Sequence, residues 1–210
     1  MPNLKVVYLN LVVISASVIS FEIISTRISS VIFVNNYAFI ILSLAILGLG
    51  CGGIYSYYRI KKKKPAELFN VIAKIIFLIG ISFSFFIIAI IKFNITNPFV
   101  YFFLLFLPFF FAGILYAQVF KYYTDHSFKL YASDLSGAAM GSVGTLGIFN
   151  LFAAPNAILF LSLLTFSSAL SFFIIPGVKK NKIISFYSII ILLTLLDFFA
   201  CLDFLHSWQV

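Results

Sequence analysis

The residues of this chain that can do chemistry are a few ionisable side chains set within long apolar runs. Glu22 and Arg27 lie in the first such run, Asp134 in the fifth and Asp197 in the seventh. A charged group in an apolar environment costs several kcal/mol unless it is paired, hydrated or neutralised. Such residues therefore favour a functional site, such as part of a pathway for a small polar or cationic solute. The alternative is a buried ion pair that only fixes the register of the helices.

The polar residues of the first run fall on one face of a helix. At about 100° per residue, a sector roughly 100° wide holds Ser15, Glu22, Thr26, Ser29 and Ser30. Arg27 flanks this sector about 140° from Glu22, so the two do not form a pair within the helix. Counted at about 1.5 Å per residue from Lys5 and Lys182, Glu22 and Asp197 reach similar depths, roughly 25 and 22 Å. We therefore predict an intramembrane polar site that contains Glu22, Thr26, Arg27 and Asp197.

Asp134 is a shallower member of the same predicted polar set. It lies roughly 7 Å above Lys129 on a helix expected over residues 131–152. A carboxylate near a helix N-terminus is stabilised by the helix dipole, so Asp134 has two interpretations, a helix cap or part of a solute site.

Small residues recur at helical spacing in two of the runs. Gly137, Gly141 and Gly144 share one face of the fifth run, and Gly48 and Gly52 share one face of the second. Strips of this kind let a neighbouring helix backbone approach closely, so we predict helix packing at these five glycines. The stretch "GLGCGG" also matches GxGxxG, but it lies inside a spanning segment and lacks the strand that a dinucleotide site requires.

Composition defines the elements that must position these residues. The chain is 63% hydrophobic and 10% charged, with a mean hydropathy of +1.15, values typical of an integral membrane protein. Continuous apolar runs of about 20 residues predict helices rather than a barrel. We expect an all-α, polytopic helix bundle forming one transmembrane domain over residues 1–210, with helices over residues 6–33, 37–58, 69–91, 98–120, 131–152, 157–175 and 183–202.

The charges predict an orientation for these seven helices. Most of the Lys and Arg residues fall in alternate gaps, namely Lys5, Arg59, Lys61 to Lys64, Lys121, Lys129, Lys179, Lys180 and Lys182. Cations flanking a span stay in the cytoplasm, so the N-terminus is predicted to be cytoplasmic. The net charge of +8 is thus a topology signal and does not indicate nucleic-acid binding.

Two segments of the chain resemble a known membrane domain. The segment "YASDLSGAAMGSVGTLGIFNLFAAPN" is similar to the Y-x-x-D-x-x-G-A-x-x-G motif of bacterial and archaeal spermidine synthase-like proteins. The segment "FEIISTRISSVIFVNNYAFIILSLAILGLGCGG" resembles the first helix pair of the same domain. The matching residues are Glu22, Thr26, Arg27, Gly48, Gly52, Tyr131, Asp134, Gly137, Ala138 and Gly141.

The resemblance implies a multi-helix module of a prokaryotic inner or plasma membrane, usually joined to an aminopropyltransferase-like domain. A Gly-rich "GGGDG" loop and an acidic polyamine pocket do not occur in this sequence, so we expect no aminopropyl transfer from this chain.

Three functions remain open. The first is a non-catalytic membrane subunit that binds a protein partner in or at the bilayer. The second is a permease-like module for a small polar or cationic solute such as a polyamine. The third is an intramembrane enzyme, although no GxSxG or HExxH motif accompanies Glu22 and Asp197. No cofactor or metal is expected, because CxxC pairs are missing and His126 and His206 are isolated.

Overall fold

The computed structural model describes residues 4–33, 38–59, 65–93, 97–172 and 194. Within these residues the chain forms helices and no strand. The elements are α1 (Leu4–Ile32), α2 (Ala38–Arg59), α3 (Pro65–Phe93), α4 (Pro98–Tyr122), the short 3-10 helix η1 (Thr124–His126), α5 (Ser127–Leu151) and α6 (Ala154–Ser171).

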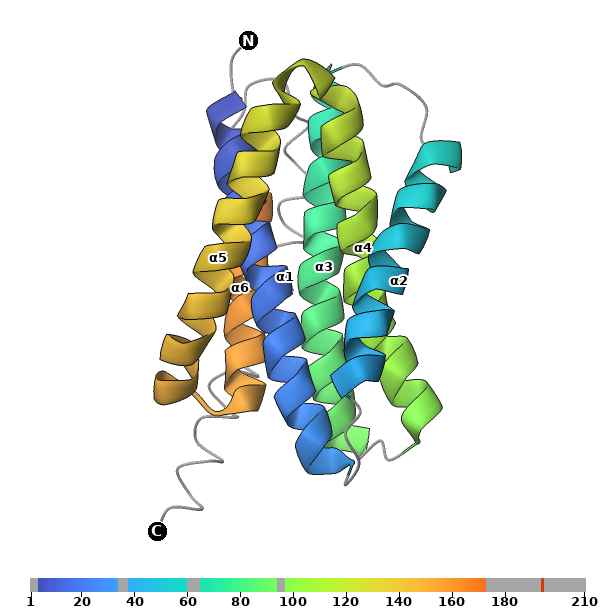
Figure 1. Cartoon of the computed structure of the whole chain (residues 1–210), viewed down its shortest axis with the longest axis vertical. Coiled ribbons are helices and arrows are strands. Elements are labelled where there is room, and N and C mark those ends of the chain that lie inside the picture. The colour runs from blue at the N-terminus through green and yellow to red at the C-terminus, as the bar shows by residue number, and fades with distance from the viewer. Residues whose placement is uncertain (1–3, 34–37, 60–64, 94–96, 173–193, 195–210) are drawn as a thin grey trace.

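Consecutive helices run in opposite directions along the bundle (Figure 1). The helices α1, α3 and α5 therefore begin at the end of the bundle where α2 and α4 finish, and η1 joins α4 to α5 at that end (Figure 1). Exposed cations at this end are Lys5, Arg59, Lys121 and Lys129, whereas Arg27 and Lys92 lie near the opposite end. We call the first end the cation-rich end.

The first six predicted spans coincide with α1 to α6, and their ends differ from the prediction by a few residues. The difference that matters most for the position of Asp134 is at the start of α5, which begins at Ser127 rather than at residue 131. The seventh predicted span, residues 183–202, lies outside the described residues except for Thr194, and Asp197 lies outside them as well.

Five helices of the described chain are long and apolar enough to cross a membrane: α1, α2 from Phe39, α3 from Leu68, α4 and α6. These helices indicate a helical membrane protein. A helix can cross the apolar bilayer because it satisfies its backbone hydrogen bonds internally. The remaining long helix, α5, is not in this set. Its sequence is rich in Gly and Ser and includes Asp134 and Asn150, which lowers its hydropathy.

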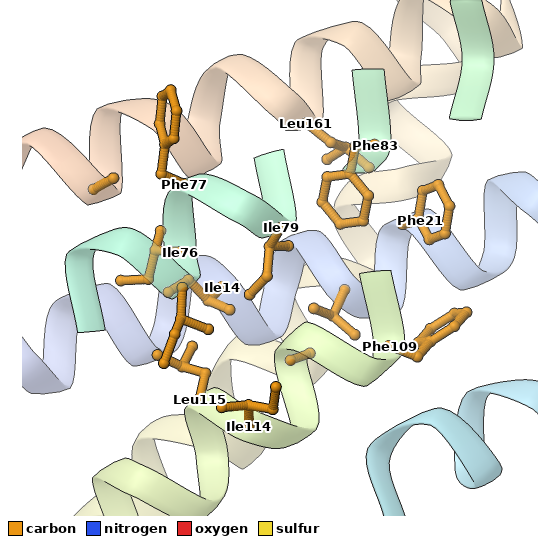
Figure 2. Packing of buried hydrophobic residues seen from close by; sticks show 14 of the residues in the cluster. Ile14, Phe21, Ile76, Phe77, Ile79, Phe83, Phe109, Ile114, Leu115 and Leu161 are labelled. Atoms are coloured by element: carbon orange, nitrogen blue, oxygen red, sulfur yellow. The ribbon is translucent and has the colours of Figure 1, made fainter. Parts of the chain in front are cut away.

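Helix packing in the bundle is uneven. The helix α1 packs mainly on α5 and α6, α3 packs on α4 and α6, and α2 packs almost entirely on α4. At the centre, large side chains of α1, α3 and α4 meet, including Phe21, Phe83 and Phe109 (Figure 2). This core leaves α2 and α5 at the periphery, where each covers one side of the bundle.

Candidate functional site

The site begins with the close approach of α5 to α1. A Cβ atom added at Gly137 would overlap the backbone of Val12, and one added at Gly141 would overlap the backbone of Ala16. Only glycine at these two positions allows the two helices to come this close. Gly144 differs from the prediction, because a Cβ at this position would meet no atom within 4 Å.

The same close approach occurs between α2 and α4. A Cβ at Gly48 would lie 2.6 Å from the Phe109 side chain, and one at Gly52 would overlap the backbone of α4 at Phe110. From the other side, a Cβ at Gly113 would overlap the backbone of Leu49. The glycines of both helices therefore mark backbone contacts, and these contacts frame two sides of the site.

Three polar side chains from different helices meet beside the α1–α5 contact. Ser15 of α1 is buried, and its Oγ donates to Asp134 Oδ1 of α5 at 2.5 Å. The hydroxyl of Tyr116, on α4, lies 3.0 Å from the same Ser15 Oγ. Because Ser15 gives its single proton to Asp134, Tyr116 donates to Ser15. We call Ser15, Tyr116 and Asp134 the carboxylate cluster.

This position excludes the helix-cap interpretation of Asp134. The residue at the N-cap of α5 is His126, and no side-chain cap hydrogen bond forms there. Asp134 comes seven residues after Ser127, about 10 Å along the axis, which is beyond the first turn where the dipole acts. The sequence prediction placed the helix start too late because the preceding residues are polar.

The carboxylate cluster lines a cavity of about 380 Å³. It is lined by Ser15, Val18 and Ile19 of α1, by residues of α5 that include Asp134, and by residues of α2 and α4. In this cavity the hydroxyls and the carboxylate are the polar side chains, and the other lining residues are aliphatic or glycine. Asp134 is half-buried, so one part of the carboxyl group remains accessible from the cavity.

Glu22 continues the same face of α1 toward the other end of the bundle. It follows Ser15 by seven residues and Ile19 by three, spacings that repeat one helical face. The axial separation from Ser15 is about 10 Å. Glu22 is half-buried, and its carboxyl group has no hydrogen bond or ion pair in the described part of the chain.

Arg27 and Thr26 do not join the carboxylate cluster. Arg27 is exposed, and its guanidinium lies 4.7 Å from the ring centroid of Phe149 on α5. Thr26 Oγ1 donates to the carbonyl oxygen of Ile23 at 2.7 Å, within its own helix. The polar residues predicted to form one site are thus distributed over two regions, with Asp134 near the cation-rich end and Arg27 near the opposite end.

Several polar links between helices were not predicted from the sequence. Asn10 of α1 donates to Ser171 Oγ at 2.7 Å and accepts from Ser168 Oγ at 2.5 Å, both on α6. Gln118 of α4 donates to Ser56 Oγ of α2 at 2.6 Å. The polar type and helical position of these residues were visible in the sequence, but the identity of each partner was not.

A further buried link joins Ser29 Oγ and the Tyr101 hydroxyl, 2.6 Å apart. Both residues are fully buried. The Ser29 hydroxyl is used in this internal link, and Ser29 does not line the cavity of the carboxylate cluster. These links are structural, since each satisfies a polar group inside the bundle.

Among the described residues, His, Cys, Asp and Glu form no group of three or more that could hold a metal ion. No protein-family model, no curated protein sequence and no solved structure matches the chain. The function must therefore be inferred from the geometry of the described helices.

Proposed function

We propose that this chain is a seven-helix protein of a prokaryotic cell membrane, with its N-terminus in the cytoplasm, that binds and moves a small cationic solute. The topology is supported by the gathering of Lys5, Arg59, Lys121 and Lys129 at one end, since cations concentrate on the cytoplasmic side. The seventh helix of this proposal is the span predicted from the sequence over residues 183–202.

One observation carries the functional proposal: Asp134 lines an open cavity between α1, α2, α4 and α5, and its polar neighbours among the described residues are neutral hydroxyls. No Lys, Arg or His of the described chain pairs with it, and its neighbours are the hydroxyls of Ser15, which donates to it, and Tyr116. Neutral hydroxyls compensate an ionised carboxylate only partly in an apolar environment. A cation that enters the cavity therefore supplies the missing charge partner of the Asp134 carboxylate.

The lining of the cavity suggests the class of cation. A metal ion requires several oxygen ligands, whereas this cavity offers one carboxylate beside two hydroxyls. Val18, Ile19 and Leu49 instead provide apolar contact for methylene groups. An aliphatic amine, with an ammonium at Asp134 and a hydrocarbon chain along these residues, matches both features, and a polyamine belongs to this class.

The experiment measures uptake of labelled spermidine into proteoliposomes that contain the purified full chain. Asp134→Asn removes the negative charge while keeping the shape of the side chain, so we expect uptake to fall to the level of empty liposomes. The matched control is Asp125→Asn, because Asp125 is an exposed acid in η1 near the same end of the bundle.

Glu22→Gln tests how far the path extends along α1. We expect a partial loss of uptake, because Glu22 lies on the same helix face about 10 Å from Ser15 but outside the cavity lining. Equal uptake by the unchanged chain and Asp134→Asn would contradict the proposed function. Equal losses in Asp134→Asn and Asp125→Asn would assign the effect to general surface charge.

A second candidate function is a non-catalytic subunit like the membrane module of spermidine synthase-like proteins, which binds another membrane protein. The outward face of α5 favours it. Gly144 and Gly147 have open space beside them, and Met140 and Val143 are exposed on the same helix. Glycines on an outer helix face permit close approach of another helix.

Purification in mild detergent separates this candidate from the first. Gly147→Leu should abolish co-purification of a stable partner, while Gly50→Leu, at an equally open glycine on α2, should preserve it. Identical complexes from both variants would argue against docking on α5.

A further inference from the structure

A second cavity lies at the end of the bundle opposite the cation-rich end. Its volume is about 470 Å³, and it is formed where the last turns of α1, α3 and α5 meet the start of α6. Ile28, Ile32, Ile87 and Ile90 supply much of its surface. We call this cavity the isoleucine slot.

Arg27 is the cation that lines the isoleucine slot. It is exposed, and its guanidinium stacks on Phe149 at 4.7 Å from the ring centroid. No acidic side chain of the described residues pairs with Arg27. Stacking on Phe149 holds the guanidinium beside the apolar slot and leaves its N–H donors available to an external acceptor.

The combination of an apolar cavity and one cation without an acidic partner among the described residues selects among membrane components. A free anion such as phosphate would use Arg27 but not the isoleucines. A neutral lipid would fill the apolar space but leave the guanidinium without an acceptor. An anionic lipid satisfies both, because its phosphate can accept two N–H bonds from Arg27 while an acyl chain lies in the slot.

The size of the slot agrees with this occupant. At about 470 Å³, it exceeds the roughly 30 Å³ share of one water molecule more than tenfold, so it has room for a segment of an acyl chain. In a bilayer, an open apolar cavity of this size is filled by hydrocarbon rather than by water.

We propose that the isoleucine slot is a binding site for an anionic phospholipid, with the phosphate at Arg27 and part of an acyl chain between α1, α3 and α6. The site is distinct from the carboxylate cluster, because Arg27 lies twelve residues, about 18 Å, beyond Ser15 along α1. It does not depend on the proposed handling of a cation.

Native mass spectrometry of the full chain in mild detergent tests the proposal with phosphatidylglycerol and phosphatidylcholine of identical acyl chains. We expect retention of phosphatidylglycerol over phosphatidylcholine. Arg27→Gln should weaken phosphatidylglycerol retention about tenfold, since a charged hydrogen bond contributes about 1.5 kcal/mol or more. Lys92→Gln is the matched control, because Lys92 is an exposed cation near the same end and is not part of the slot lining.

A second variant separates the apolar contribution from the charge. Ala153 is exposed and lines the slot, so Ala153→Phe should occupy part of the slot and weaken phosphatidylglycerol retention while Arg27 remains in place. Inorganic phosphate should not compete with the lipid, because it makes no use of the apolar lining. Circular dichroism establishes that both variants keep the helical fold.

Three results would overturn the proposal. Equal losses in Arg27→Gln and Lys92→Gln would show general attraction to a charged surface. Undiminished binding in Ala153→Phe would show that no acyl chain uses the slot. Effective competition by inorganic phosphate would identify a simple anion site.

Discussion

The two sides of α1 are packed by opposite means. Toward α5, the backbones approach each other at Gly137 and Gly141, and hardly any side-chain volume separates them. Toward α3 and α4, aromatic rings fill the space, with the ring centroid of Phe21 4.4 Å from that of Phe83 and 5.7 Å from that of Phe109 (Figure 2).

This difference explains where polar chemistry is found. Short side chains such as Ser15 and Ser20 reach across the α1–α5 contact, where Ser20 Oγ donates to the carbonyl oxygen of Gly141 at 3.0 Å and Ser15 reaches Asp134. On the aromatic side, Phe21, Phe83 and Phe109 are fully buried and their rings contact one another. The cavity beside Asp134 instead lies next to the close backbone contact of α1 and α5.

The largest effect on stability should come from the aromatic side. Phe21 is fully buried, so Phe21→Ala should lower the free energy of unfolding by about 3–5 kcal/mol through lost packing and the cavity it leaves. Denaturation by SDS from mild-detergent micelles measures this change. The control is Phe39→Ala, because Phe39 is 79% exposed; a similar loss in both variants would refute the importance of ring packing around α1.

A smaller effect is expected on the glycine side. Gly141→Ala would place a Cβ 2.7 Å from the Ala16 Cα, and neither backbone can yield without moving a helix. We expect a loss of about 1–3 kcal/mol in the same SDS titration, the usual cost of overpacking. Cation uptake should fall as well, since Asp134 moves away from Ser15.

Gly144→Ala is the internal control for this change. A Cβ at Gly144 meets nothing within 4 Å, and alanine favours the helix more than glycine does. The variant should keep its stability and its uptake. Equal destabilisation by both alanines would mean that helix propensity or lipid contact, rather than the approach of α5 to α1, controls the effect.

The smallest effect should follow from removal of one hydrogen bond across the contact. Ser20→Ala should cost about 0.6 kcal/mol, the average for such bonds between membrane helices. The loss remains small because the carbonyl oxygen of Gly141 also accepts from Thr145 Oγ1, at 2.7 Å. If Ser20→Ala lowered the free energy of unfolding more than Gly141→Ala does, hydrogen bonding rather than backbone proximity would hold α5 in place.

Much of the helical framework could be predicted from the sequence, because apolar runs of spanning length leave the backbone few alternatives. The prediction of close packing at Gly48, Gly52, Gly137 and Gly141 agrees with the structure, since small residues at helical spacing form a strip whatever lies opposite. Gly144 takes no part in the α1–α5 contact, because a Cβ there would meet no atom within 4 Å. Periodicity identifies a helix face but does not reveal how far a neighbour follows it.

The polar site was only partly predictable. Ser15 and Asp134 both stood out in the sequence, yet Tyr116 did not, and nothing in the spacing joined residues of α1, α4 and α5. The predicted grouping of Glu22, Thr26 and Arg27 with Asp197 relied on one helix face and on depth, and Asp197 lies outside the described residues. In the structure, Arg27 turns to Phe149 and Thr26 to its own backbone.

The sequence by itself determined that this chain is a helical membrane protein and which helix faces carry small or polar residues, because these properties depend on hydropathy and on a period of 3.6 residues. Only the tertiary structure decided that Ser15, Tyr116 and Asp134 share one cavity and that Arg27 lines another. Those pairings depend on the distance and rotation between helices, which are set by the glycine contacts and the aromatic core together.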